Sequence, residues 1–331
     1  MTDFTKTVET VGRDIGAVHD ALSRVIVGQD DLLRYLLIAI FAGGHVLLEG
    51  LPGLGKTHLA KALAAALGVR LGRVQCTPDL LPADITGSDV LSADAKSVEF
   101  RPGPVFANLV LVDEINRATP RTQAALLEAM QEFQVTYGGT AYELPTPFWI
   151  VATQNPIELE GTFPLPEAQL DRFLFKIDIG YPSADSLEEL LDTSLDSEPA
   201  DELEALLTTQ RVQEIVNATR EVLVSEAVRK GAIRLILGTQ PDSEFAAVSA
   251  KEHVRYGASP RALQALIRAA RVRALFSGRV QVDFDDLRAV ATPVLSHRML
   301  LKTVSELDGI TIDSVIRTLL GEWQDGLGQT R

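Results

Sequence analysis

The pattern of apolar and polar positions changes near residue 180. Before that point, five segments have the apolar pattern that predicts buried parallel strands: the runs at 46–48, 109–112, 148–153 and 173–177 and a stretch at 71–76. After Gly180-Tyr181-Pro182 strand patterns vanish and helical periodicity takes over. We therefore predict an α/β fold, with a doubly wound five-stranded parallel sheet in a domain over residues 1–181 and a smaller all-α lid domain over 182–331.

The same pattern places helices and hairpins around the strands. Apolar residues between Val8 and Val25 recur at helical spacing and predict an amphipathic N-terminal helix, and a second helix over 30–41 precedes the first strand. Two stretches near 88–100 and 134–144 predict β-hairpins that are inserted in the α/β domain. The helices expected in the C-terminal domain lie at 184–195, 200–222, 225–238, 260–276, 284–296 and 304–324.

Charge and composition narrow the class of protein. The formal net charge of the 331 residues is −14, so the chain as a whole repels the phosphate backbone of nucleic acids. The single cysteine, Cys76, excludes an internal disulfide, and the five histidines lack the spacing of zinc ligands. There is no apolar run long enough to span a membrane and no apolar signal core near the first residues. We expect a cytoplasmic protein.

One glycine-rich stretch carries a specific chemistry. Residues 50–57 read Gly-Leu-Pro-Gly-Leu-Gly-Lys-Thr, with a strand pattern before them and a helix pattern after them. Glycines in such a loop let backbone N–H groups point at phosphate oxygens, and the helix N-terminus adds a partial positive charge. Lys56 is expected to reach the β- and γ-phosphates, and the Thr57 hydroxyl to bind Mg²⁺. The stretch therefore predicts a nucleotide-binding loop.

Polar residues follow two other predicted strands. Asp113 and Glu114 end the apolar run at 109–112, and Asn155 follows the run at 148–153. The carboxyl ends of strands form the edge where open α/β sheets bind ligands. We expect Asp113 to hold Mg²⁺, Glu114 to act as general base on a water molecule, and Asn155 to orient that water. The alternatives are a solvated strand end for the two carboxylates and a polar turn before Pro156 for Asn155.

In combination these motifs resemble the AAA+ ATPases, and within them the MoxR family. The resemblance runs from Val27-Gly28-Gln29 to residue 298 and covers nearly the whole chain. Beyond the loop at 50–57, it rests on Leu-Val-Asp-Glu-Ile-Asn-Arg-Ala at 111–118, on Ala-Thr-Gln-Asn-Pro at 152–156, on the stretch 160–173 and on Gly-Ala-Ser-Pro-Arg-Ala at 257–262.

The resemblance implies further roles. Asn155 matches the sensor-1 residue, Arg172 the arginine finger that reaches a neighbouring subunit's γ-phosphate, and Arg261 the sensor-2 arginine, acting on either its own or the adjacent nucleotide. Arg172 in a surface salt bridge to Asp171 or Glu167 and Arg261 as an ordinary exposed arginine are the alternatives. The full set expected to contact ATP is Val27, Gly28, Gly50, Pro52, Gly53, Leu54, Gly55, Lys56, Thr57 and His58.

The implied activity is Mg²⁺-dependent ATP hydrolysis in a ring, expected to be a hexamer. The resemblance implies a function in chaperone-like remodelling or maturation of protein complexes, including metal or cofactor insertion. It also implies that a von Willebrand factor A-domain protein is the partner. The two hairpins match inserts that touch the client, with a decorated sheet edge as the alternative. A nucleic-acid motor is a second possibility, which the acidic balance and the lack of a basic tract with interleaved aromatics disfavour. A nucleotide-gated scaffold is a third, which the intact Asp113-Glu114 pair disfavours.

Overall fold

The computed structural model describes residues 2–91, 98–157, 161–188 and 203–328. By contacts the chain divides into two compact units. The α/β unit comprises Gly16–Phe173 and Ile177–Glu214, and the lid unit comprises Met1–Ile15, Leu174–Lys176 and Ile215–Arg331. Units defined by contacts are not the same as domains along the chain, so the boundary expected between residues 181 and 182 stays a prediction.

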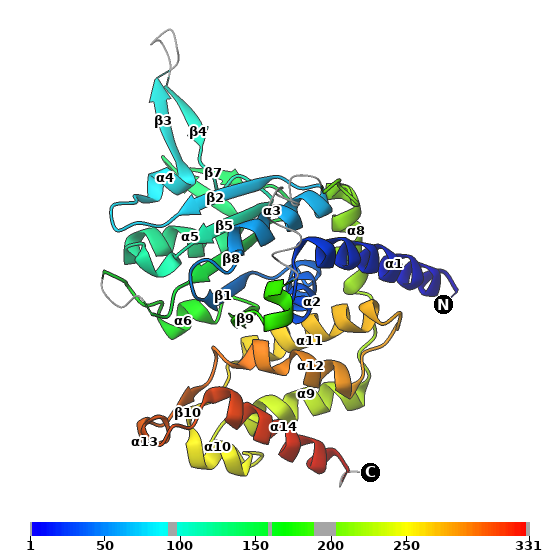
Figure 1. The fold of residues 1–331 in the computed structure, drawn as a ribbon. Helices are drawn as coiled ribbons and strands as arrows, with labels where there is room; N and C mark the ends of the chain where they lie inside the picture. The colour runs from blue at the N-terminus through cyan, green and yellow to red at the C-terminus, as the bar shows by residue number, and fades with distance from the viewer. Residues whose placement is uncertain (1, 92–97, 158–160, 189–202, 329–331) are drawn as a thin grey trace. The chain divides into compact units, whose positions relative to one another are not determined.

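The α/β unit is built on the five-stranded sheet that the apolar runs predicted. Its strand order is β2-β5-β8-β1-β9, where β2 is Leu71–Gln75, β5 is Leu109–Asp113, β8 is Trp149–Gln154, β1 is Val46–Gly50 and β9 is Phe175–Ile179 (Figure 1). The register is parallel from β2 to β5, from β5 to β8 and from β8 to β1. All of β5 is buried, as its uninterrupted apolar run requires.

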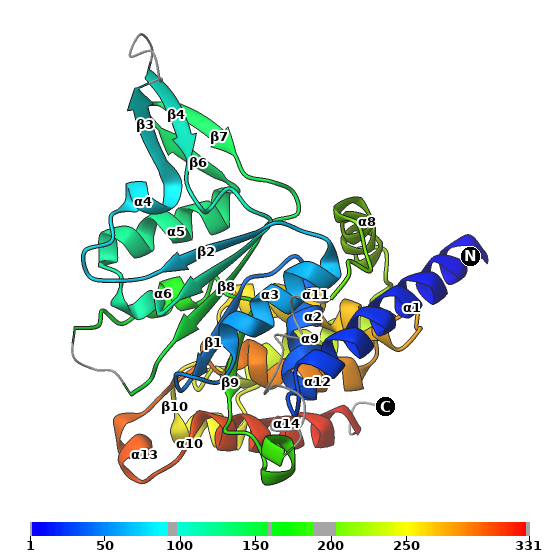
Figure 2. The same ribbon diagram turned by 45° about the horizontal axis from the view of Figure 1, so that its top comes forward.

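Helices cover both faces of this sheet. Helix α5 (Pro120–Glu132) places Leu126, Leu127 and Met130 in one buried cluster with Val110 and Val112 of β5. Helices α2 (Asp30–Phe41) and α3 (Lys56–Leu67) lie on the other side of the sheet, as Figure 2 shows. On that side the indole N–H of Trp149 donates to the carbonyl of Ile40 at 2.9 Å. The long α1 (Thr2–Val25) confirms the amphipathic N-terminal helix, because its apolar positions from Val8 to Leu22 are buried.

Two hairpins project near the β2 edge of the sheet. Short α4 (Pro82–Thr86) leads into β3 (Gly87–Leu91), which pairs with β4 (Val98–Pro102), and β6 (Gln134–Tyr137) pairs with β7 (Thr140–Glu143). Both predicted hairpins are confirmed. Figure 2 draws the two hairpins side by side. They contact each other through Phe100, whose ring stacks on Tyr142 at 4.1 Å between centroids and lies 5.3 Å from Tyr137. The shared aromatic contacts make the two inserts one structural group.

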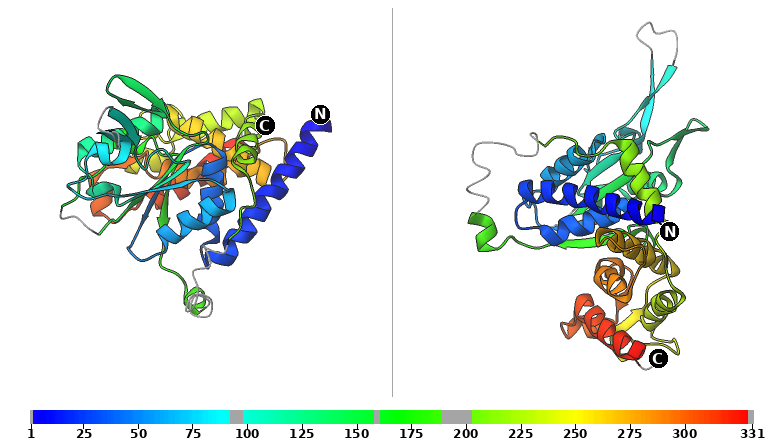
Figure 3. Two further views of the ribbon diagram at one scale, coloured as in Figure 1. Left: turned by 90° about the horizontal axis from the view of Figure 1, so that it is seen from above. Right: turned by 90° about the vertical axis from the view of Figure 1, so that its right-hand side faces the viewer.

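The lid unit is helical. Its helices α9 (Glu226–Gly238), α11 (Pro260–Phe276), α12 (Phe284–Leu295) and α14 (Ile312–Gly328) pack side by side, and the right-hand view of Figure 3 draws them from yellow-green to red. Helix α8 (Thr209–Thr219) precedes them along the chain, and α10 (Val248–His253) and α13 (Thr303–Leu307) are short. Within the described residues, the chain has no helix that is both long and apolar enough to cross a membrane.

The lid differs from the sequence-based prediction in four details, and the first is the short helix α10, which was not expected. A small antiparallel ladder of β10 (Val254–Tyr256) and β11 (Leu300–Leu301) was missed, because two paired residues leave no periodicity. The helix expected over 304–324 is two helices, α13 and α14, separated at Gly309, whose φ is +77°. The helix expected over 200–222 begins only at Thr209, and residues 189–202 of the expected helical stretches lie outside the described residues.

Candidate nucleotide site

The loop between β1 and α3 has the backbone of an anion cradle. Gly53 and Gly55 have φ angles of +82° and +76°, a region that side chains with a Cβ rarely enter. A Cβ on either glycine would meet nothing within 4 Å, so the conformation and not crowding demands glycine there. At Gly50 the reason is different, because a Cβ would lie 3.0 Å from the Cβ and carbonyl oxygen of Ile179. Helix α3 begins directly after Gly55, at Lys56.

Lys56 lies against the backbone of this loop. Its ammonium donates a hydrogen bond to the carbonyl oxygen of Gly50. Burial lowers the pKa of Lys56, while the charges of Asp113, Glu114 and Glu49 raise it by smaller amounts. The lysine predicted from the loop and the carboxylates predicted from β5 therefore lie within electrostatic reach of one another.

Asp113 and Glu114 end β5 in different environments. Asp113 is only 7% exposed, and its Oδ2 accepts a hydrogen bond of 3.0 Å from Nε of Arg73 on β2 and forms an ion pair of 3.0 Å with Nη2 of the same arginine. Glu114 has a φ of +56°, which is unusual for a residue with a side chain. Its backbone N–H donates to the hydroxyl of Thr153 on neighbouring β8 at 2.9 Å. The chain thus turns sharply at the strand end and presents two adjacent carboxylates.

The Glu114 carboxylate is held by residues that the sequence analysis missed. Its Oε2 accepts from the Gln75 amide at 3.2 Å and from Arg117 at 3.1 Å. Gln75 is the last residue of β2 and lies opposite Asp113 in the register of β2 and β5. The only sequence signal for Gln75 was its position as a polar residue at the end of a predicted strand. That signal indicates a site residue only once the strand order shows that β2 lies beside β5. Arg117 follows Glu114 within the short 3-10 helix η1 (Ile115–Arg117).

Asn155 follows β8 and is 5% exposed. Its side-chain oxygen accepts from the backbone N–H of Ile157 at 3.2 Å, the local contact of a polar turn, so that alternative for Asn155 stays open. Its carbonyl accepts from the Asn116 amide at 3.4 Å. Asn116 links the loop after β5 to the loop after β8, and its own side-chain oxygen is buried without a hydrogen-bond partner among the described residues. The geometry brings Asn155 beside the Asp113-Glu114 segment without deciding its role.

A small cavity of about 230 Å³ adjoins the phosphate loop. Five of the expected ATP contacts line it, together with residues that the sequence analysis did not select; the full lining is Val25, Ile26, Val27, Gln29, Gly53, Leu54, Gly55, His58, Tyr181, Pro182 and Leu187. Most of these side chains are apolar, which fits the faces of a purine ring. Gly28 lies close to the Ser186 side chain, since a Cβ there would lie 2.2 Å from the Ser186 hydroxyl oxygen. Cavity and loop together fit a nucleotide, with the base on the apolar side.

The two predicted arginines lie in different units. Arg172 is in the α/β unit, where its Nη1 donates to the carbonyl of Leu127 on α5 at 2.9 Å and its Nε is buried without a hydrogen-bond partner among the described residues. The described contacts of Arg172 are with backbone, and its salt-bridge alternative with Asp171 or Glu167 stays a prediction beside the arginine-finger role. Arg261 is in the lid unit, exposed in the first turn of α11 beside its N-cap Ser259.

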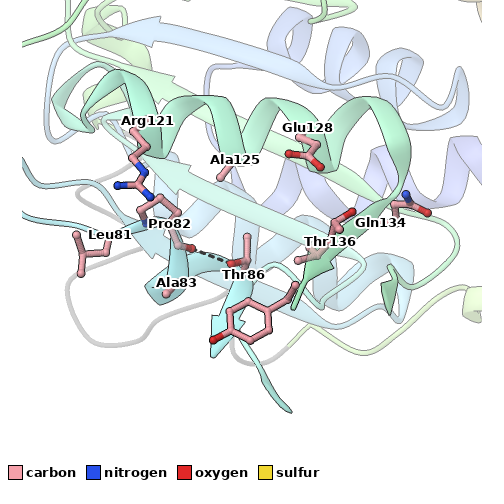
Figure 4. Close-up of a pocket in the computed structure, with 11 residues that line it drawn as sticks. Leu81, Pro82, Ala83, Thr86, Arg121, Ala125, Glu128, Gln134 and Thr136 are labelled. Carbon is pink, nitrogen blue, oxygen red and sulfur yellow. Dashed lines mark hydrogen bonds between the residues drawn. The ribbon is translucent and has the colours of Figure 1, made fainter. Parts of the chain in front are cut away.

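A second concavity lies at the root of the hairpins. It has a volume of about 390 Å³ and opens between α4, α5 and β6. Figure 4 shows Arg121 and Glu128 of α5 on one side, Leu81 and Pro82 at α4, and Thr136 of β6. Leu81 is 62% exposed. This cavity belongs to the inserts and contains none of the residues expected to contact ATP.

Comparisons with known proteins agree with this geometry. Residues 45–175 match the ATPase family associated with various cellular activities (AAA), and residues 246–319 match the AAA lid domain. The chain is 40% identical to chaperone MoxR1 of Mycobacterium tuberculosis over 90% of this chain and 79% of the relative. It is 35% identical to protein MoxR of Methylorubrum extorquens over 93% of this chain and 91% of the relative.

The chain belongs to the MoxR family of AAA ATPases. A solved structure of a proposed ATPase from Cytophaga hutchinsonii supports the same conclusion at the level of the fold, with a TM-score of 0.88, 39% identity and coverage of 96% of both chains. In this MoxR-family chain the AAA match begins just before β1 and ends in β9, so it contains the phosphate loop, the strand-end carboxylates and both hairpins. The lid match begins shortly before α10 and ends within α14.

Proposed function

We propose that this chain binds ATP with Mg²⁺ and hydrolyses it to ADP and phosphate. The observation that carries the proposal is the meeting of three groups at one end of the sheet: the phosphate loop, Lys56, and the carboxylates of Asp113 and Glu114. The loop with Lys56 and the pair of carboxylates come from two different segments of the chain. A positive group between a glycine loop and strand-end carboxylates is the arrangement that phosphoryl transfer to water requires.

Each residue then has a distinct task. The N–H groups of the loop and Lys56 bind the phosphates, and the cavity lined by Val27, His58 and Tyr181 takes the base. Thr57 and the buried Asp113 would hold Mg²⁺, which when bound neutralises charge on the phosphate oxygens. Glu114 accepts the proton of the attacking water, and Asn155 orients that water. Arg172 of a neighbouring subunit and Arg261 stabilise the charge of the transition state.

We further propose that hydrolysis drives chaperone-like remodelling or maturation of protein complexes, including metal or cofactor insertion, by a cytoplasmic, hexameric ring. One relative is named a chaperone. The hairpins support a client-binding role, because Leu91 and Val98, a register pair next to the hairpin end, are 69% and 61% exposed. A von Willebrand factor A-domain protein is the partner that the resemblance to the family suggests.

The test separates nucleotide binding from chemistry. Lys56→Ala is expected to abolish ATP binding, because the phosphate charge loses its partner, whereas Glu114→Gln keeps ATP bound and lowers the hydrolysis rate about 10²–10⁴-fold. Calorimetric ATP titration and steady-state phosphate release measure the two effects. Lys61→Ala on the same helix and Glu132→Gln at the end of α5 are matched controls. Equal loss of ATP binding in both site variants contradicts the role of Glu114, and normal hydrolysis in both contradicts the proposed activity.

A further inference from the structure

The lid unit contains a cavity rich in arginine. It has a volume of about 520 Å³ and lies between α9 and α11. Three arginines line it, Arg229, Arg268 and Arg271, together with Gln264. Val224, Leu263 and Ile267 form an aliphatic floor. Arg268 and Arg271 are one turn apart on α11 and therefore share a face of that helix. We call this cavity the arginine pocket.

The positive charge of the arginine pocket is not compensated within the described residues. Neither Arg268 nor Arg271 has a hydrogen bond or ion pair there, and the Nε of Arg271 is buried without a partner. Arg229 makes one long contact of 3.5 Å to the carbonyl of Val224. The nearest carboxylate in sequence, Glu226, forms an ion pair of 2.7 Å with Lys230 instead.

Other arginines of the same unit are neutralised by a carboxylate. Arg273 and Arg279 both donate to the buried carboxylate of Asp286 at 2.6 Å. The chain carries 45 acidic against 31 basic residues, so carboxylates are not scarce. The three arginines of the pocket lack such a carboxylate partner among the described residues.

Electrostatics supports this conclusion. Burial lowers the pKa of Arg268, and the charge of Arg220 lowers it further. Burial and the charge of Arg229 likewise lower the pKa of Arg271. Arg268 is nevertheless exposed to solvent when the whole residue is considered. Exposure and a pKa lowered by burial are compatible for a side chain in an open concavity, because protein atoms surround its guanidinium while one face stays accessible. All these guanidinium groups stay charged at neutral pH, so they repel one another.

We propose that the arginine pocket binds an acidic segment of a partner protein. Carboxylates of that segment pair with the three arginines, and an apolar side chain between them contacts the aliphatic floor. A free phosphate ion needs no such floor and would fill little of a cavity of 520 Å³. Nucleic acid is disfavoured, because the pocket has no aromatic side chain for base stacking and the chain has a net charge of −14. The proposal does not depend on ATP hydrolysis.

The experiment measures peptide binding to the full chain without nucleotide. The probe is a fluorescein-labelled peptide of glutamate and leucine, followed by fluorescence anisotropy, with a glutamine-and-leucine peptide as the uncharged control. Arg268→Glu and Arg271→Glu are expected to weaken binding of the acidic peptide at least tenfold each, and added salt to weaken it further. Arg317→Glu on α14 is the matched control, since it makes the same charge change outside the pocket and leaves the affinity unchanged.

The conservative variant Arg268→Gln tests the fold and the site together. It removes a repelled charge, so the thermal midpoint should stay or rise while peptide affinity falls. The proposal is overturned if the acidic peptide does not bind, if the glutamine peptide binds equally well, or if Arg317→Glu weakens binding as much as Arg268→Glu. Tighter binding of duplex DNA or inorganic phosphate at the same arginines overturns it in favour of those ligands. A changed oligomeric state of Arg268→Glu in light scattering would assign the pocket to a contact between copies of this chain and overturn it too.

Discussion

At the scale of single residues, Glu114 shows how tertiary contacts maintain a strained backbone. A non-glycine residue at a φ of +56° costs about 1–3 kcal/mol and persists only when its surroundings impose it. Here the Thr153 hydroxyl accepts a hydrogen bond from the Glu114 N–H, and the side chains of Gln75 and Arg117 donate to the Glu114 carboxylate. Three different elements therefore determine where this carboxylate points.

Thr153→Val tests this positioning. The valine keeps the shape but removes the acceptor, which leaves the Glu114 N–H unpaired and lowers the free energy of unfolding by about 1–3 kcal/mol. We expect ATP affinity to be retained and the hydrolysis rate to fall, as measured by single-turnover kinetics. Thr219→Val is the matched control, because Thr219 is also buried and its hydroxyl bonds to Val216 in the lid unit. If both variants lose stability and neither loses hydrolysis, Thr153 has only a structural role.

At the scale of elements, the two hairpins pack together because Phe100 of β4 contacts Tyr137 and Tyr142 of the other hairpin. These contacts lie at the root of the β3–β4 hairpin. The register pair Leu91 and Val98 lies toward its end and remains exposed. Root and end are therefore expected to have separate functions, one in packing and one in binding.

Removing the apolar end should affect the client response and not the chemistry. We expect Leu91→Ser with Val98→Ser, or a shortened segment 92–96, to keep basal ATPase activity and to weaken stimulation by a client or partner protein. Segment 92–96 lies outside the described residues. Phe100→Ser serves as the contrasting variant, because it should loosen both hairpins and lower the thermal midpoint. Loss of basal hydrolysis in a folded, oligomeric Leu91→Ser/Val98→Ser variant would contradict this separation.

The lid has an electrostatic anchor at the start of α12. Asp286 is fully buried, and its carboxylate accepts from Arg273, from Arg279 and from the backbone N–H of Asp283. Burial raises the pKa of Asp286, but the hydrogen bonds from Arg279, Asp283 and Arg273 together outweigh it and leave the pKa below its usual 3.8. The folded lid therefore stabilises the charged form of Asp286.

Asp286→Asn should destabilise the lid by about 3–5 kcal/mol at neutral pH, because two arginines lose their partner. A lowered folded-state pKa means that this stability is complete above the unfolded value and is lost as the pH falls through the folded value. The difference between wild type and variant should hence be constant near pH 7 and shrink only below about pH 4. Urea unfolding as a function of pH measures it. A difference that already vanishes near pH 6 would exclude this ion-pair explanation.

At the scale of the whole molecule, Arg172 raises the question of assembly. If it serves the nucleotide of a neighbouring subunit, hydrolysis requires the ring, and activity per subunit should rise with protein concentration. Arg172→Ala is expected to bind ATP nearly normally and to hydrolyse it about 10³-fold more slowly or worse. Release of Arg172 from the Leu127 carbonyl would have to accompany such a role.

Mixing two inactive variants gives the decisive measurement. Lys56→Ala lacks the lysine that binds the phosphates, and Arg172→Ala lacks the arginine finger. A mixed ring therefore contains sites where a subunit with an intact Lys56 lies beside a subunit with an intact Arg172. Part of the ATPase activity should return, and co-purification of differently tagged subunits verifies that the rings are mixed. Mixed rings without recovered activity would show that Arg172 does not act between subunits.

The sequence by itself determined the elements and their chemistry where the signal is local. Buried strands need uninterrupted apolar runs, and a phosphate loop needs glycines at fixed spacing before a helix, so β5 and residues 50–57 could be recognised directly. The rule that ligands bind at the carboxyl ends of parallel strands placed Asp113 and Glu114 near Lys56 without coordinates. In the structure the charges of Asp113 and Glu114 act to raise the pKa of Lys56, which agrees with that placement, while the catalytic roles stay predictions.

Only the tertiary structure decided which residues support that site. Gln75 and Thr153 lie 39 positions from Glu114, on either side of it in the chain, and the strand order β2-β5-β8 is what brings them to it. Tyr181 and Leu187 in the wall of the base cavity, and the arginine pocket between α9 and α11, depend in the same way on contacts between distant segments. Periodicity reports which face of an element is buried, whereas the partner that buries it is set by packing in three dimensions.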